Sequence, residues 1–123
     1  MNTEKLFAIC LIVKDFEKSF NFYTEILGFK INTNEKPFAD FTLGETSLAI
    51  FEKSGATAML PTKYMNEGGS IVIAFQVKNI GAEINNLNKK GIKIVEGPKK
   101  TEWGQKVAYF LDPDKNIIEL SEI

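Results

Sequence analysis

The stretch LIVKDFEK at residues 11–18 recurs in altered form as FQVKNIGA at residues 75–82. Each copy joins the end of an apolar run to a residue that favours a helix N-cap, Asp15 in the first and Asn79 in the second. LGFKI at 27–31 and KGIKI at 90–94 repeat in the same order, each with a glycine where a helix C-terminal cap belongs. The sequence therefore predicts an internal duplication.

Each half of the chain predicts the order strand, helix, strand, strand, strand from its apolar periodicity. Strands are expected in the first half at residues 6–13, 29–34, 38–43 and 47–52, and in the second half at 70–77, 92–96, 105–111 and 116–122. The helices carry apolar stripes, which are Phe16, Phe20, Tyr23 and Leu27 in the first and Ile80, Ile84 and Leu87 in the second. Residues 53–69 contain glycines and a proline and predict a linker.

The amino-acid composition limits the classes of molecule that we expect the protein to bind. The 123 residues carry a net charge of −1, which gives no electrostatic reason to expect nucleic acid or an anionic membrane surface. We find no leader pattern and no run long enough to span a membrane. One cysteine excludes an internal disulfide, so we expect a cytoplasmic protein.

The chain contains no histidine. This excludes catalysis by Ser-His-Asp or Cys-His groups and removes the usual ligand of zinc, iron and nickel. With one cysteine, a thiolate cage is also excluded, and only an all-oxygen metal site remains conceivable.

Two stretches, LIVKDFEKSFNFYTEILGFK at 11–30 and DPDKNIIELSE at 112–122, resemble signatures of the vicinal oxygen chelate superfamily. This superfamily includes glyoxalase I, extradiol dioxygenases, fosfomycin-resistance enzymes and bleomycin-resistance proteins. The resemblance implies an α+β fold in which two βαβββ modules form an incomplete eight-stranded barrel with helices outside. A single domain would span residues 1–123, with module one at about 5–53, a linker at 54–69 and module two at about 70–123. It also implies a small-molecule ligand in the concave interior and a homodimer, formed with or without exchange of modules.

In metal-dependent members of the superfamily, four strands each supply one ligand. The resemblance places these positions at Ala8, Ala49, Val72 and Glu119. Three of the four side chains have no atom that can bind a metal ion. The one remaining carboxylate does not supply the roughly three protein ligands that a catalytic ion needs. We therefore expect no metal and no other cofactor.

Glu119 stands alone in an apolar strand, where an unpaired carboxylate is costly. If Ile118 and Leu120 pack under the helices, strand alternation turns Glu119 toward the cavity. There it would bind a ligand or act as a base. The alternative is a carboxylate that reaches solvent at the mouth of the barrel.

Trp103 lies in the polar stretch KKTEWGQK, and its large apolar ring needs a partner. The resemblance to the bleomycin-resistance branch implies that Trp103 and Gly104 line a ligand groove and that Phe38 stacks on the ligand. Phe38 and Trp103 would then form a clamp for a planar ring, and Asp40 would add a charge for a cationic ligand. The alternatives place Phe38 in the core and Trp103 over the core or at a dimer interface.

Four further features are less decisive. Tyr109 and Phe51 fit either the cavity or the core. Cys10 is expected to be a small buried apolar group without a nucleophilic role. Lys115 occupies a turn in which the resembling family usually has glycine, and a left-handed backbone is costly for lysine. Met59, Tyr64 and Met65 in the linker would anchor a loop, cover the cavity or contact a partner chain.

Three functions remain open at this stage. We favour a metal-independent bacterial protein that sequesters an antibiotic-like ligand, planar and apolar or cationic, over an enzyme. A glyoxalase-type lyase or dioxygenase would need the missing metal ligands. A metal-free enzyme would use Glu119 as a general base.

Overall fold

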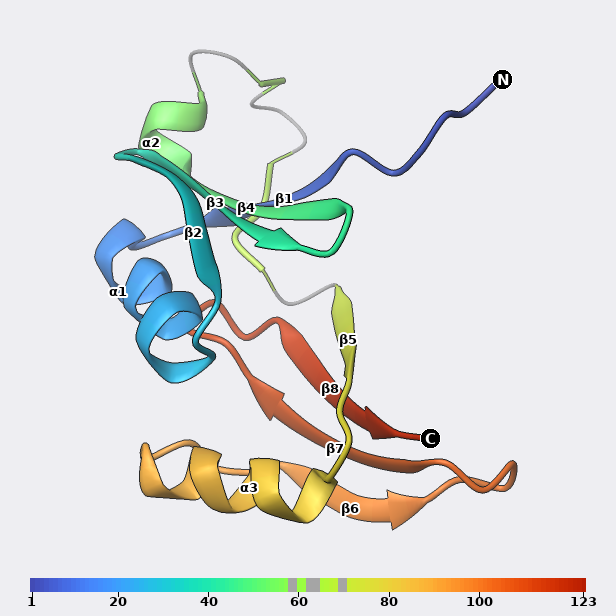
Figure 1. Ribbon diagram of the computed structural model, residues 1–123. Helices are drawn as coiled ribbons and strands as arrows, with labels where there is room; N and C mark the ends of the chain where they lie inside the picture. The colour runs from blue at the N-terminus through green and yellow to red at the C-terminus, as the bar shows by residue number, and fades with distance from the viewer. Residues whose placement is uncertain (58–59, 62–64, 69–70) are drawn as a thin grey trace. The chain divides into compact units, whose positions relative to one another are not determined.

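The computed structural model describes residues 1–57, 60–61, 65–68 and 71–123, so the expectations for Met59 and Tyr64 lie outside the described residues. The chain divides into two compact units, Met1–Gly68 and Gly69–Ile123 (Figure 1).

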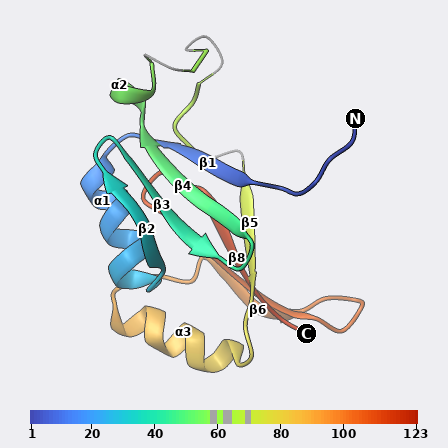
Figure 2. The same ribbon diagram turned by 45° about the horizontal axis from the view of Figure 1, so that its top comes forward.

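The first unit is a four-stranded sheet with helices. Its strands lie in the order β1-β4-β3-β2, with β1 parallel to β4 and the other pairs antiparallel (Figure 2). The elements in chain order are β1 (Ala8–Val13), α1 (Phe16–Asn21), η1 (Phe22–Ile26), β2 (Lys30–Glu35), β3 (Phe38–Leu43), β4 (Thr46–Glu52) and α2 (Lys53–Ala56).

The second unit repeats this topology. Its strands lie in the order β5-β8-β7-β6, with β5 parallel to β8. The elements are β5 (Val72–Gln76), α3 (Ile80–Lys89), β6 (Glu96–Lys100), β7 (Lys106–Leu111) and β8 (Ile117–Glu122). The predicted α+β class and the duplicated βαβββ order are therefore confirmed, as two separate four-stranded mixed sheets.

Both predicted N-caps are confirmed. Asp15 Oδ1 accepts a hydrogen bond from the Lys18 amide at 3.1 Å, and Asn79 Oδ1 accepts one from the Ala82 amide at 3.0 Å. The sequence pattern alone did not reveal a second contact at each helix start. Each uses a carboxylate from the end of the last strand in the same unit.

In the first unit, Glu52 Oε2 accepts from the Phe16 amide at 2.9 Å. In the second, Glu122 Oε2 accepts from the Ile80 amide at 2.7 Å. These carboxylates satisfy amides that the helix itself leaves without partners, and their charge suits the positive end of the helix dipole. Each contact joins the start of a helix to the strand that comes last in the chain order of its unit, which is β4 or β8.

Each sheet buries one face under its helix. In the first unit the fully buried rings of Tyr23 and Phe41 stack at 5.8 Å between centroids. In the second unit, α3 packs against β7 and β8 and buries Ile80 and Leu87. The buried strand residues on the helix side include Leu11, Val13, Ala39, Leu48, Ile50, Ala108, Phe110, Ile118 and Leu120.

Two helical details differ from expectation. The first helix continues as the π-helical segment η1, in which the Leu27 amide bonds to the Phe22 carbonyl at 2.9 Å. Phe22, which lay outside the predicted stripe, is also buried in the core. The prediction that residues 53–69 form only a linker was wrong at its start, because α2 occupies Lys53–Ala56.

The strand predicted at residues 92–96 was also placed wrongly, because β6 runs from Glu96 to Lys100. The apolar residues before it return the chain from α3 to the sheet, and the Ile92 amide bonds back to the Leu87 carbonyl at 2.9 Å. The strand itself is an edge strand with lysines and Pro98, a composition that apolar periodicity does not detect.

The last hairpin contains the DPDK turn, which Asp112 organises. Its Oδ1 accepts from the Asp114 amide at 2.9 Å and the Asn116 amide at 2.8 Å, while its Oδ2 accepts from Asn116 Nδ2 at 2.8 Å. Lys115 keeps the left-handed conformation, with φ of 65°. The turn thus forms despite the lysine, because Asp112 and Asn116 fix the backbone on both sides.

We predict that Glu122→Ala lowers the free energy of unfolding of the second unit by about 1 kcal/mol, because the Ile80 amide loses its acceptor. Glu122→Gln retains an acceptor oxygen and should lose less. Trp103, the single tryptophan, reports urea unfolding of this unit by its fluorescence. The control is Glu102→Ala in an exposed loop, and equal effects of Glu102→Ala and Glu122→Ala would contradict the role of this contact.

We also predict that Lys115→Gly raises the free energy of unfolding by up to about 1 kcal/mol, because glycine removes the left-handed strain of lysine but adds entropy to the unfolded chain. The same urea measurement checks it. Lys93→Gly, at an exposed position without positive φ, should be neutral or destabilising. A destabilising Lys115→Gly would contradict the prediction, because it would show that the strain of the lysine is smaller than the entropic effect of glycine.

Candidate functional site

The sheet faces opposite the helices carry the candidate site residues. Cross-strand register places Cys10, Ala49 and Asp40 in one row of the first sheet. The corresponding row of the second sheet contains Ala74, Glu119 and Tyr109. Ala49 and Glu119 thus occupy equivalent positions on β4 and β8, as the resemblance implies.

The side chains at the four positions where the resembling family holds its metal do not fit a metal ion. Ala8 is half-buried, Ala49 is buried and Val72 is exposed, and none of these side chains has a donor atom. Among the residues that the structure describes, no group of three or more histidine, cysteine, aspartate or glutamate side chains is arranged to hold an ion. The described residues at these positions therefore do not fit the metal-dependent chemistry of the family.

Glu119 is half-buried on the face of the second sheet opposite α3, since its neighbours Ile118 and Leu120 are buried on the helix side. The expectation of an unpaired carboxylate was wrong. Tyr109 lies directly across from Glu119 on β7, and its phenol donates a hydrogen bond to the carboxylate. This hydrogen bond, followed by partial burial, raises the pKa of Tyr109 above its ordinary value.

The edge strand β6 adds two charges beside Tyr109. Glu96 pairs with Tyr109 in the sheet register, and Lys99 Nζ lies 5.7 Å from the centroid of the tyrosine ring. Lys99 and Glu96 form an ion pair with each other. Tyr109 therefore lies between Glu119 on one side and a mutually neutralising pair on the other.

Asp40 in the first sheet is bound by neutral donors. Ser47 Oγ donates to it at 2.9 Å, and Asn32 Nδ2 donates at 3.2 Å. Partial burial acts to raise the pKa of Asp40, but hydrogen bonds from Ser47, Asn32 and Thr33 outweigh it and hold the pKa below its ordinary value. Asp40 is thus an ionised group that also links β2, β3 and β4.

Phe38 lies on the same face as Asp40, as predicted from strand alternation. Its half-buried ring meets the ring of Phe51 edge-on, at 5.6 Å between centroids. The two residues are register partners on β3 and β4 and form an aromatic pair opposite the helix.

Trp103 lies in the turn between β6 and β7 and is 76% exposed, so the alternative that it covers the core was wrong. Its Nε1 donates to Gln105 Oε1 at 2.8 Å, and Gln105 Nε2 in turn donates to the hydroxyl of the buried Ser121. Gly104 adopts a φ of 90°, which a side chain would strain, and its amide bonds to the Thr101 carbonyl at 3.0 Å. A short hydrogen-bonded chain therefore connects the exposed indole to β8.

The sequence reasoning missed Gln105, Ser121 and the pair Lys99–Glu96. Ser121 shares the strand parity of Glu119, which was a usable signal. The approach of Lys99 to Tyr109 depends on an irregular register between Glu96 and Lys99, which no sequence pattern announces.

Cys10 is exposed, so the prediction that it is buried was wrong. Neighbouring atoms nevertheless remove enough water from the thiol to raise its pKa. A raised pKa disfavours the thiolate that nucleophilic attack requires.

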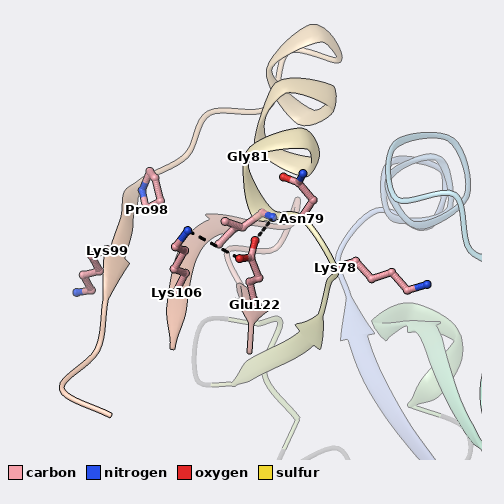
Figure 3. A pocket seen from close by; sticks show the side chains of 8 residues that line it. Lys78, Asn79, Gly81, Pro98, Lys99, Lys106 and Glu122 are labelled. Atoms are coloured by element: carbon pink, nitrogen blue, oxygen red, sulfur yellow. Dashed lines mark hydrogen bonds and ion pairs between the residues drawn. The ribbon is translucent and has the colours of Figure 1, made fainter. Parts of the chain in front are cut away.

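A pocket of about 570 Å³ lies at the start of α3, and Figure 3 shows residues that line it. Lys78, Lys99 and Lys106 line this pocket, but Glu122 points into it and binds both Lys106, at 3.8 Å, and the Ile80 amide. Lys78 and Lys99 extend away from Glu122 (Figure 3). Because a protein carboxylate already uses the helix N-terminus, this pocket does not offer an anion site.

Within the described part of the chain, no helix has both the length and the apolar character that a membrane-crossing helix requires.

The family model of the glyoxalase-like domain matches residues 6–123. The uncharacterized protein YraH of Bacillus subtilis (strain 168) is 32% identical over 123 residues, which cover 94% of this chain and 96% of that protein. The metallothiol transferase FosB of Staphylococcus saprophyticus is 32% identical over 110 residues, covering 88% of this chain and 70% of FosB.

Solved structures share the fold. TnmS3, described as an antibiotic binding protein from Streptomyces sp. CB03234, matches with a TM-score of 0.79 at 27% identity, covering 99% of this chain and 98% of that one.

We predict that Gln105→Leu releases Trp103, because it removes both hydrogen bonds of the chain to Ser121. The steady-state fluorescence anisotropy of Trp103 should fall, and the second unit should lose about 1 kcal/mol of stability. Glu102→Gln, beside Trp103 but outside this chain of bonds, serves as the control. Unchanged anisotropy in Gln105→Leu would show that the indole is held in another way.

Proposed function

The chain belongs to the family of the glyoxalase-like domain, and from this premise we propose that it is a metal-independent protein that binds and sequesters a small, planar, apolar or cationic molecule of the antibiotic kind. The proposal places it in the reducing cytoplasm as a homodimer.

The donor set carries this proposal. The family's metal positions hold Ala8, Ala49 and Val72, and the remaining carboxylate, Glu119, accepts a hydrogen bond from Tyr109. A polarising ion that stabilises an enediolate or activates oxygen needs several protein ligands, and these side chains do not provide them. The missing donor atoms weigh against a lyase, dioxygenase or transferase that depends on a metal.

The antibiotic-binding protein TnmS3 has the same fold at 27% identity and supports the ligand class. FosB supports the alternative, since its name describes a metallothiol transferase. The absence of histidine from this chain weighs against that alternative, because imidazole is the commonest ligand of catalytic transition metals.

Each unit carries residues that we propose contact a ligand. In the first unit, Phe38 would bind a planar part and Asp40 a polar part. In the second unit, Trp103, with Gly104 in its turn, would bind a planar part, and Tyr109 and Glu119 would bind a polar part. The exposed indole of Trp103 supports a binding role, because a large apolar ring held by hydrogen bonds in water gains free energy when a ligand covers it.

A metal-free enzyme remains a second candidate, and one observation favours it. Glu119 and Tyr109 form a hydrogen-bonded pair of an acceptor and a donor, a combination that general acid–base catalysis uses. Turnover of a substrate with an acidic C–H bond, in the presence of chelator and lost in Glu119→Gln, would establish it in place of sequestration.

We predict that planar antibiotics, with metal-free bleomycin among them, quench Trp103 fluorescence saturably in chelator-treated protein. A dissociation constant of about 1 μM corresponds to about −8 kcal/mol of binding free energy. Trp103→Phe with an extrinsic probe, and Phe38→Ala, should each weaken binding. Light scattering on the same sample measures the mass and tests the homodimer.

Two results would contradict the proposal. One is no quenching across the panel of antibiotics. The other is a stoichiometric divalent ion in the purified protein whose removal abolishes binding or turnover.

A further inference from the structure

We infer that Tyr109 is a positioning residue that holds Glu119 in the orientation in which its carboxylate meets a positively charged nitrogen of the ligand. The inference rests on the proposed function and names the polar group that such a ligand would carry.

The geometry of the second sheet supports the positioning role. Tyr109 and Glu119 are register partners on adjacent antiparallel strands, so their side chains leave the sheet side by side on the same face. The phenol donates to the carboxylate. A carboxylate has two oxygens and about four acceptor sites, so one donated bond fixes the group and leaves acceptor capacity for a ligand.

The tyrosine ring is itself held. Lys99 lies over it with Nζ at 5.7 Å from the centroid, and Lys99 is paired with Glu96 in the neighbouring strand. The four side chains therefore form a connected set from β6 across β7 to β8. Lys99 restricts the ring of Tyr109, and the phenol of Tyr109 restricts the carboxylate of Glu119. These side chains therefore lose little conformational freedom when a ligand binds, and this favours affinity.

The charges around Glu119 determine the sign of the ligand. On the face of the second sheet opposite α3, register and strand alternation place Glu119 as the one charged side chain of β5, β7 and β8, all of which the structure describes. On the edge strand β6, Lys99 and Glu96 also lie beside Tyr109, but they pair with each other. A cation is complementary to this arrangement, and an anion is repelled.

The charged groups facing Tyr109 are Glu119 from β8 and Lys99 and Glu96 from β6. The hydrogen bond to Glu119, partial burial and the charges of Glu119 and Glu96 raise the pKa of Tyr109, while Lys99 opposes them. Because the folded-state pKa is raised, the donating phenol is present at neutral pH and is lost only as the pH rises through the raised value. Tyr109 can thus orient Glu119 throughout the neutral range.

The test compares two probes of similar size and planarity, quinoline and N-methylquinolinium, at pH 8, where the first is neutral and the second is a permanent cation. Isothermal titration calorimetry should show that the protein prefers the cation. Glu119→Gln should weaken N-methylquinolinium binding by about fivefold, the range of a partly exposed ion pair, and leave quinoline unchanged. Tyr109→Phe should weaken it by about two- to threefold, again without effect on quinoline.

The control is Glu45→Gln, which removes one negative charge from an exposed turn of the first unit and should change neither affinity. An NMR titration of the tyrosine Cζ resonances adds a readout that a purely structural role would not move. The pKa of Tyr109 should fall in Glu119→Gln and also when N-methylquinolinium, but not quinoline, is added.

The outcomes separate the two proposals. If neither probe binds the wild-type protein, both the planar-ligand site and the positioning role fail. If both probes bind with equal affinity, or if Tyr109→Phe weakens both equally, the positioning of Glu119 toward a cation is wrong while sequestration of planar ligands stands.

Discussion

The contact between a carboxylate at the end of the last strand and the first amide of the helix controls the geometry of each unit. Glu52 makes this contact with Phe16, and Glu122 makes it with Ile80. Because the first and last strands of each unit run parallel, their C-terminal ends lie at the same end of the sheet, where the helix begins. The contact therefore fixes the start of the helix relative to this parallel strand pair. A shift of that pairing by one residue would turn every side chain to the other face.

That register produces one row of candidate site residues in each sheet, and the residues of the two rows differ. In the first sheet the carboxylate is Asp40 on β3, held by Ser47 and Asn32. In the second it is Glu119 on β8, held by Tyr109, the register equivalent of Asp40. The duplicated scaffold thus keeps one carboxylate per row but places it on a different strand. The strand pairing is the same in both copies, while the carboxylate and its hydrogen-bond donors occupy different positions.

The sequence predicted features governed by local rules and missed those governed by tertiary context. Asp15, Asn79 and the duplicated element order followed from capping chemistry and apolar periodicity, and the structure contains them. The strand β6 was misplaced because an edge strand needs no apolar pattern, and its residues are lysines, a glutamate, a glycine and a proline. The hydrogen bond from Tyr109 to Glu119 was missed because cross-strand partners depend on the register, which sequence alone did not specify. Strand parity placed Phe38, Asp40 and Glu119 on their faces correctly, because alternation needs only the strand itself.

The net charge of the chain does not by itself determine which ligand the proposed site would bind. The whole chain carries −1, which by itself suggests no preference for a cation. Its fifteen basic residues are all lysines, whose long side chains keep their charge in water. In the second sheet, the face opposite α3 carries Glu119 on β8, while Glu96 and Lys99 on β6 pair with each other. Charges within about one Debye length, roughly 8 Å at physiological salt, set the local electrostatic potential. The potential near Glu119 is therefore negative, since Lys99 is paired with Glu96, and the weak net charge of the whole chain does not argue against the proposed cationic ligand.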